Sequence, residues 1–215
     1  MYKQLDLQNW KRKEHFDFFN QFDEPFFGIV TEIDCTNAYT FCKSNSIPFF
    51  LYYHYQAILA VNQMEEFRYR IKDDEIIIFD AIHVTTTISR VDNTFAFSFI
   101  PFTQSFSEFS VLARIEIDRI KSSSGLCVNH NTSRIDVIHF STVPWIKFTG
   151  VTHARDFKYK DSVPKITFGK YFQQNTRILM PVSVNVHHGL MDGFHVGQFL
   201  HFFEQLMNEN THCII

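Results

Sequence analysis

Three histidines, one aspartate and three glycines lie close together in the segment HHGLMDGFHVGQF, residues 187–199. Histidine and aspartate are residue types that transfer protons or bind metal ions. An alternating apolar stretch precedes them and predicts a strand, so His187 and His188 should point to opposite faces, and only one can face a given site. Gly189 allows a sharp turn directly after His188. An imidazole with an ordinary pKa of about 6.5, presented at such a turn, suits a general base.

Asp192 lies four residues after His188, and the spacing leaves several roles open. The two side chains could be metal ligands, but zinc requires three or four, and no HExxH or cysteine partner is nearby, which disfavours a metal site. Asp192 either orients His188 directly or pairs with an arginine. A packed histidine beside a capping aspartate is the alternative without chemistry. Gly193 and Gly197 are expected on the packed face of the following helix.

The composition argues against several classes of protein. The 215 residues are 45% apolar and 20% charged with a net charge of -3, which is typical of one globular domain spanning residues 1–215. Basic residues are scattered, so nucleic acid is not an expected partner. No apolar run is long enough to span a membrane, and the N-terminus lacks the apolar core of a secretory signal. Four cysteines without CxxC spacing indicate packing thiols in a reducing cytoplasm.

Phenylalanine is unusually abundant, with 26 residues against 2 tryptophans. Most of these rings are expected to form an aromatic-rich core. Some could instead line an apolar ligand pocket or a subunit interface.

Apolar periodicity and turn residues predict helices alternating with antiparallel hairpins, without a regular βαβ rhythm. No glycine-rich phosphate loop follows a strand, which argues against a dinucleotide-binding fold. The pattern indicates an α+β fold, a two-layer mixed and largely antiparallel sheet with helices packed on it. The predicted helices are 36–46, 48–63, 105–123 and 193–209; the predicted hairpins are 68–80 and 165–188; and further strands are 94–102 and a segment that ends at Pro144.

Five motifs in order resemble the chloramphenicol acetyltransferase family, whose signature is HHxxxDGFHV. The resemblance covers the whole chain. The bare HHxxxDG pattern also occurs in dihydrolipoyl acyltransferase cores and in peptide-synthetase condensation domains, but the FHV extension and the chain length favour the first family. The motifs are DLQNWKRKEHFDFF, IKDDEIIIFD, FSTVPWIKF, ITFGKY and HHGLMDGFHVGQF.

The resemblance implies direct transfer of an acetyl group from acetyl-CoA to a hydroxyl, with no covalent acetyl-enzyme. His188 matches the general base that takes the proton of the acceptor. Ser141 matches the serine that stabilises the tetrahedral oxyanion, a role worth about 2.7–4 kcal/mol for a single donor. Thr167 matches a threonine that helps through a bound water.

Other matched positions imply supporting roles. Asp192 matches an aspartate that forms a salt bridge with an arginine, here Arg12. Lys170 and Tyr171 match residues near the adenosine end of CoA. The family's homotrimer places each active site between subunits, with the histidine from one subunit and much of the pocket from its neighbour.

The expected acceptor site consists of Phe18, Phe19, Phe27, Phe95 and His139. Two of these depart from the family pattern, because Phe19 stands where a tyrosine is usual and His139 where asparagine is common. Residues 149–164 match poorly, with polar His153 and Asp161 where apolar or aromatic residues are expected.

The favoured function is therefore chloramphenicol O-acetylation without a metal. The alternatives are an acetyltransferase of the same fold with a different hydroxyl acceptor, and a trimeric binding protein without turnover. His187 is expected to be structural, and His195 to pack or cap the final helix.

Overall fold

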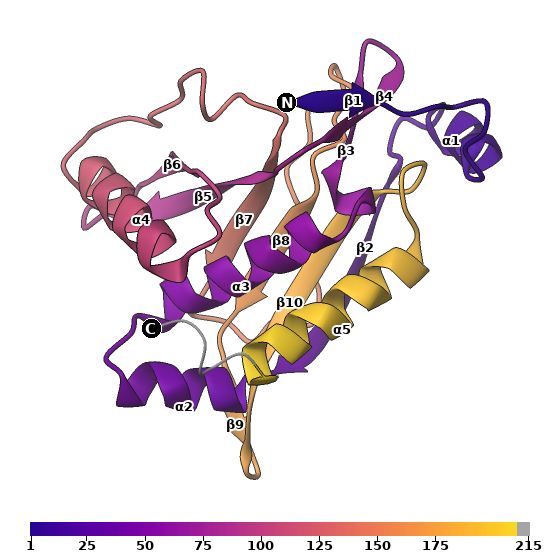
Figure 1. Ribbon diagram of the computed structural model, residues 1–215. Coiled ribbons are helices and arrows are strands. Elements are labelled where there is room, and N and C mark those ends of the chain that lie inside the picture. The colour runs from indigo at the N-terminus through magenta and orange to yellow at the C-terminus, as the bar shows by residue number, and fades with distance from the viewer. Residues whose placement is uncertain (210–215) are drawn as a thin grey trace.

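The computed structural model describes residues 1–209 and is built around a seven-stranded sheet (Figure 1). The strand order is β2-β10-β8-β7-β5-β6, with β9 paired to β10. Strand β7 runs parallel to both β5 and β8, and the other pairs are antiparallel. The predicted α+β class with a largely antiparallel sheet is confirmed. The strands are β2 (Phe26–Asp34), β5 (His83–Ser89), β6 (Phe95–Ile100), β7 (Val137–Val143), β8 (Lys165–Gly169), β9 (Phe172–Gln174) and β10 (Arg177–His187).

One face of this sheet is covered by helices α2 (Thr36–Ser44), α3 (Phe49–Gln63) and α5 (Gly193–Glu209) (Figure 1). Helix α3 is apolar on nearly every side and buries ten of its fifteen residues, as expected for a helix in the middle of a layer. Pro48 lies at its N-cap with an extended backbone conformation. No helix of residues 1–209 is long and apolar enough to cross a membrane.

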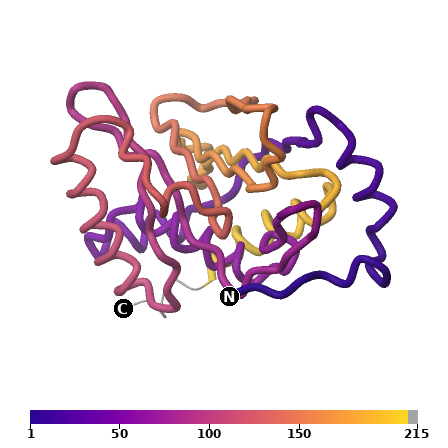
Figure 2. The backbone as a smooth tube through the Cα atoms, turned by 90° about the horizontal axis from the view of Figure 1, so that it is seen from above, coloured from indigo at the N-terminus to yellow at the C-terminus, as the bar shows by residue number. Residues whose placement is uncertain are grey.

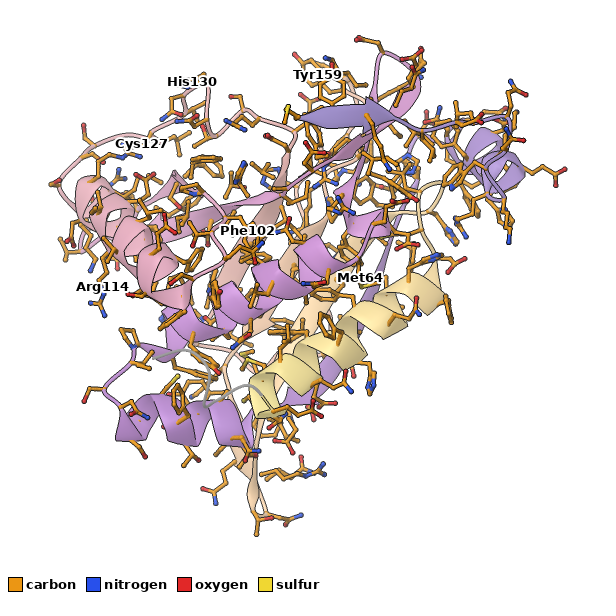
Figure 3. All side chains as sticks on the ribbon, viewed as in Figure 1. Met64, Phe102, Arg114, Cys127, His130 and Tyr159 are labelled. Atoms are coloured by element: carbon orange, nitrogen blue, oxygen red, sulfur yellow. The ribbon has the colours of Figure 1, made fainter. Side chains whose placement is uncertain are left out.

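Helix α4 (Phe106–Lys121) packs against β5 and β6. Ser105 caps its first turn by accepting a hydrogen bond from the backbone N–H of Glu108. The inner side buries Phe109 and Ala113, whereas Arg114 extends from the outer side into solvent (Figure 3).

Strand β10 shows how the sequence separates the two faces of the sheet. Val182, Val184 and Val186 belong to the core cluster that also contains α3 and α5 residues. The alternate positions carry Ser183, Asn185 and His187, so the opposite face is polar. Figure 2 shows the segment around residue 150 on that opposite side, away from the helices.

A smaller sheet, in the order β1-β4-β3, joins the N-terminus to the hairpin of β3 (Tyr69–Lys72) and β4 (Glu75–Phe79). The hairpin turns at Asp73 and Asp74, whose φ angles of 51° and 62° are the left-handed values of a tight two-residue turn. Strand β1 (Tyr2–Gln4) is followed by helix α1 (Lys13–Phe19), and a 3-10 turn at Glu66–Arg68 precedes β3.

The predicted helices and hairpins are confirmed with small shifts at their ends. Strands β1, β2 and β5 were not predicted, and the second hairpin contains the additional short strand β9. Cys35, Cys42 and Cys127 are free thiols, and Cys213 lies outside the described residues.

Candidate active site

His188 lies where β10 ends and a short turn leads to α5. Its backbone N–H donates to the carbonyl of Pro25 at 2.8 Å. The imidazole stacks on Phe19, with ring centroids 3.9 Å apart and an interplanar angle of 4°, and it also contacts Phe27 at 4.5 Å. Its Nδ1 is buried without a hydrogen-bond partner among residues 1–209. The two rings therefore fix the plane of the imidazole, and Nε2 is the nitrogen left to exchange a proton.

His187 points to the other side of the strand, and its side chain is buried. Its Nδ1 accepts a hydrogen bond from the backbone N–H of Gly189 at 3.1 Å, and its ring lies edge-on to Phe26. Burial, followed by the positive charge of Arg155, lowers the pKa of His187 to about 4, so this imidazole is neutral at pH 7.

Gly189 is required by close packing rather than by a positive φ. A Cβ at this position would lie 3.1 Å from Cε1 of His187 and 3.3 Å from the Cα of Phe16. The prediction for the other two glycines of the motif was wrong. Gly193 and Gly197 are exposed, and a Cβ on Gly197 would meet no atom within 4 Å, because the buried face of α5 is formed by other residues.

Asp192 pairs with Arg12 and does not contact the ring of His188. Arg12 Nη1 lies 2.5 Å from Asp192 Oδ2, and Arg12 Nη2 donates to the carbonyl oxygen of His188 at 3.2 Å. The other carboxylate oxygen of Asp192 accepts hydrogen bonds from His195 Nδ1 at 2.8 Å and from the backbone N–H of Phe194 at 3.0 Å, which caps α5. The spacing left two roles open for Asp192, orienting His188 directly or pairing with an arginine, and the structure shows the pair with Arg12.

Charge and hydrogen bonding keep Asp192 ionised. Burial raises the pKa of this carboxyl, but the hydrogen bonds from Arg12 and His195 outweigh burial and hold the pKa at about 2. The ion pair therefore persists through the whole neutral range and ties α1, the turn after β10 and the start of α5 together.

Ser141, His139 and Phe95 lie elsewhere, on the polar face of the sheet. All three line a cavity of about 420 Å³. Thr167 is the cross-strand neighbour of Ser141, and its hydroxyl lies 3.4 Å from His153 Nε2. A cavity of this size is suitable for a small organic molecule.

Lys170 and Tyr171 line a second large cavity, of about 450 Å³. Its wall combines the cation of Lys121 with apolar side chains of α3, including Phe49, whose ring lies 5.6 Å from that of Tyr171. Thr87 lines this cavity and the Ser141 cavity, so the two are neighbours. The lining thus combines two lysines, Lys121 and Lys170, with apolar side chains.

The expected site residues thus fall into separate groups, and one chain does not bring them all together. Ser141, Thr167 and Ser183 lie in one row across β7, β8 and β10, and His188 is five residues further along β10. Two strand spacings and five residues of extended chain separate Ser141 from His188 by roughly 19 Å. In acyl transfer the base and the oxyanion donor each lie within about 3 Å of an oxygen atom, and these two oxygens are bonded to the same carbon in the tetrahedral intermediate. His188 and Ser141 of the same chain therefore cannot share a reaction centre.

The aromatic residues expected at the acceptor site are divided in the same way. Phe18 and Phe19 lie on α1 beside His188, and Phe18 is exposed with its ring 5.1 Å from that of Phe19. Phe27 joins this group through its contact with His188, whereas Phe95 is across the sheet at the Ser141 cavity.

Four further residues line the cavities on the polar face and were not predicted from the sequence: Phe97, Thr87, Arg155 and Lys165. Alternation along KITF could have placed Lys165 on the same face as Thr167. Within residues 1–209, no group of three or more histidine, cysteine or acidic side chains could hold a metal ion.

Comparisons with known proteins identify the family of the chain. The family model "Chloramphenicol acetyltransferase" matches residues 1–204. Chloramphenicol acetyltransferase 3 of Escherichia coli is 32% identical over 96% of this chain and 97% of its own, and a Bacillus pumilus relative is 28% identical over 99% and 95%.

Solved structures give the same result. A chloramphenicol acetyltransferase structure superimposes with a TM-score of 0.90 at 30% identity, covering 97% of this chain and all of the other. A dihydrolipoamide acetyltransferase of Azotobacter vinelandii, 11% identical with a TM-score of 0.70 over 92% of this chain and 86% of its own, shares the fold alone. The chain therefore belongs to the chloramphenicol acetyltransferase family and is an acyltransferase.

Proposed function

We propose that the protein transfers the acetyl group of acetyl-CoA to a hydroxyl group of chloramphenicol, by direct transfer with His188 as the general base. The observation that carries this proposal is the geometry of His188. Its ring plane is set by Phe19 and Phe27, and its carbonyl is held by Arg12 of the ion pair with Asp192. Such support presents one imidazole nitrogen in a fixed direction, as a general base requires.

The proposed reaction balances without any further reactant. Nε2 of His188 removes the proton of the acceptor hydroxyl while that oxygen forms a bond to the thioester carbonyl carbon. The hydroxyl of Ser141 donates to the oxyanion of the tetrahedral intermediate, and Thr167 assists through a bound water. When the C–S bond breaks, the thiolate leaves and takes the proton back from the imidazolium of His188. The products are the acetyl ester and free CoA.

We further propose that each active site combines two copies of the chain in a homotrimer. The separation of His188 from Ser141 supports this, because a head-to-tail contact brings the base of one copy to the cavity of the next and closes as a ring. Exposed aromatic side chains on both parts are consistent with an interface, among them Phe18, Phe22, Phe95 and Phe97.

The acetyl-CoA site is proposed to be the cavity of Lys170 and Tyr171, where the ammonium meets a phosphate and the ring stacks on adenine. We also propose that the enzyme is a single domain that acts in the cytoplasm and confers resistance to the antibiotic. Its free thiols and its use of acetyl-CoA support a reducing, intracellular location.

The direct test mixes the purified protein with acetyl-CoA and chloramphenicol and follows release of free thiol. We expect saturable release that His188→Ala lowers by several orders of magnitude, while circular dichroism and the oligomeric state stay unchanged. No thiol above background, with acetyl-CoA binding shown independently, would refute chloramphenicol acetylation.

Two alternatives remain testable in the same assay. Polar residues in the Ser141 cavity favour an acetyltransferase for a different hydroxyl acceptor, which would release thiol with another alcohol but not with chloramphenicol. A trimeric binding protein without catalysis would bind acetyl-CoA and release no thiol with any acceptor.

A further inference from the structure

A row of polar side chains crosses the sheet beside the Ser141 cavity. The cross-strand partners are Thr85 and His139, then His139 and Lys165, then Lys165 and Asn185. Direct cross-strand partners share one face of a sheet, so these side chains lie side by side on the polar face. Two residues along β8 separate Lys165 from Thr167, the neighbour of Ser141, which is a distance of about 7 Å.

Lys165 is a buried cation with hydrogen-bonding capacity to spare. Its side chain is only 11% exposed, and its ammonium bonds to Asp161 Oδ2 and to the carbonyl of Val163. An ammonium has three N–H donors, so one donor remains after these two contacts. Lys165 lines both the cavity of about 420 Å³ that contains Ser141 and an adjoining one of about 210 Å³.

Lys165 belongs to a cluster of two cations and two carboxylates. Arg155 is also only 11% exposed, and both cations lie over the ring of Phe26, at 4.6 Å for Lys165 and 3.7 Å for Arg155. They share the carboxylate of Asp161, since Arg155 Nε is 3.9 Å from Asp161 Oδ2. The second carboxylate, that of Glu24, pairs with Arg155 at the surface, where it is 45% exposed. Of these four groups only Lys165 lines the Ser141 cavity, so the cluster presents a cation and no carboxylate to it.

His153 supplies a second polar group at the junction of the two cavities. It lines both of them. Its Nε2 contacts the hydroxyl of Thr167, and its Nδ1 has no hydrogen-bond partner among residues 1–209. Burial is the main cause that lowers the pKa of His153, and the charges of Lys165 and Arg155 lower it further. The lining of the Ser141 cavity includes no carboxylate.

We propose that Lys165 and His153 bind an anionic group of the acceptor, such as a carboxylate, about 7 Å from the hydroxyl that is acetylated. The preferred acceptor is then a hydroxy acid with an apolar spacer that packs on Phe95 and Phe97. This inference rests on the proposed acetyl transfer and adds a second class of acceptor to it. Chloramphenicol has no anionic group and leaves the third N–H of Lys165 without a partner, whereas the carboxylate of a hydroxy acid accepts from it.

The test compares two probes that differ only in charge, 4-(hydroxymethyl)benzoate and its methyl ester. The measured quantity is the ratio of their kcat/KM values with acetyl-CoA. In the unchanged enzyme we expect the carboxylate to be favoured at least tenfold. A double variant, Lys165→Met with Asp161→Asn, removes both charges of the pair so that neither is left alone in the interior. It is expected to bring the ratio close to one.

The exposed Lys158 gives a matched control from the same segment, since Lys158→Met also removes one positive charge and is expected to keep the ratio. A ratio near one in the unchanged enzyme would overturn the inference. So would a double variant that still prefers the carboxylate as strongly as the unchanged enzyme does. Chloramphenicol is assayed in parallel to separate the two proposals. If chloramphenicol releases thiol but the carboxylate is not preferred over its ester, the anion site is refuted and the proposed acetyl transfer stands.

If no acceptor releases thiol, the proposed function fails, and calorimetric binding of 4-(hydroxymethyl)benzoate then decides the inference separately. Binding that is tighter than that of the ester and is lost in the double variant supports an anion site. Equal or absent binding of the two probes overturns it.

Discussion

The ion pair of Arg12 and Asp192 joins side chains 180 positions apart in the sequence and also reaches the backbone of the general base. Arg12 Nη2 donates to the carbonyl oxygen of His188, so the carboxylate acts on the base through the guanidinium and not by touching the imidazole. Asp192 is thus a positioning residue. The two side chains are 14% and 33% exposed, which leaves much of their interaction protected from solvent screening.

Replacing Asp192 with asparagine should lower both activity and stability. It leaves the guanidinium of Arg12 unpaired, and we expect kcat to fall about tenfold to a hundredfold and the free energy of unfolding to fall by about 2 kcal/mol. Steady-state kinetics and urea unfolding measure the two effects. The exposed pair of Lys13 and Asp17 on α1 provides the control, since Asp17→Asn should change stability by less than about 0.5 kcal/mol. Unchanged kcat in Asp192→Asn would refute the positioning role.

Ser141→Ala tests the oxyanion donor. Because this hydroxyl is expected to bind the transition state and not the ground state, kcat should fall about a hundredfold with little change in the KM of the acceptor. Ser124→Ala, on an exposed loop, is a control of the same chemistry and should leave both constants unchanged. A rise in KM with kcat retained would make Ser141 a binding contact instead.

Lys170→Met tests the CoA site. The ammonium is expected to meet a phosphate of CoA, so the KM for acetyl-CoA should rise about tenfold while the KM for the acceptor stays constant. Acetyl-dephospho-CoA, which lacks the 3′-phosphate, identifies the group that is contacted. A loss that is the same with both thioesters would argue against contact with that phosphate.

Buried histidines should make stability depend on pH. Burial, followed by the charge of Arg155, lowers the pKa of His187 to about 4, whereas an unfolded histidine titrates at about 6.5. The unfolded chain therefore binds the proton first, so stability is complete above pH 6.5 and declines as the pH falls toward 4. His187→Asn should make this decline shallower in thermal unfolding at a fixed protein concentration. His130→Asn, at an exposed position, should leave the slope unchanged, and an identical slope in both variants would contradict the assignment.

The sequence predicted the parts of the fold that are encoded locally. Helix α3 has a proline at its start and apolar residues all round, and the β3–β4 hairpin turns at Asp73 and Asp74. Strand β2 was missed because most of its side chains are half-buried, and β5 because its three consecutive threonines interrupt the apolar alternation.

The candidate site shows the same division between local and long-range information. Strand alternation separated His188 from His187, but helix spacing could not show which face of α5 is packed, and Gly197 proved to be exposed. The stacking of Phe19 on His188 depends on how distant segments pack. The separation of His188 from Ser141 follows only from the register of three strands.

That separation gives the most specific prediction, complementation between two inactive chains. His188→Ala lacks the base and Ser141→Ala lacks the oxyanion donor, so each variant alone should be nearly inactive. If the active site takes His188 from one copy and Ser141 from the next, random mixed trimers contain intact sites wherever a Ser141→Ala chain supplies the base to a His188→Ala chain. Equal mixing then restores about one quarter of all sites, which corresponds to about one third of the sites in the mixed trimers.

The measurement co-expresses the two variants with different affinity tags and purifies in two steps to retain mixed assemblies, with thiol release as the readout. Two variants that both lack the base, His188→Ala and His188→Gln, form the matched control, because no arrangement of these chains contains an intact site. Activity in the first mixture and none in the second would show a site built from two copies. If mixed assemblies form and stay inactive, each chain must bring its own base and donor together, which the strand register of this fold does not allow without a rearrangement of β10.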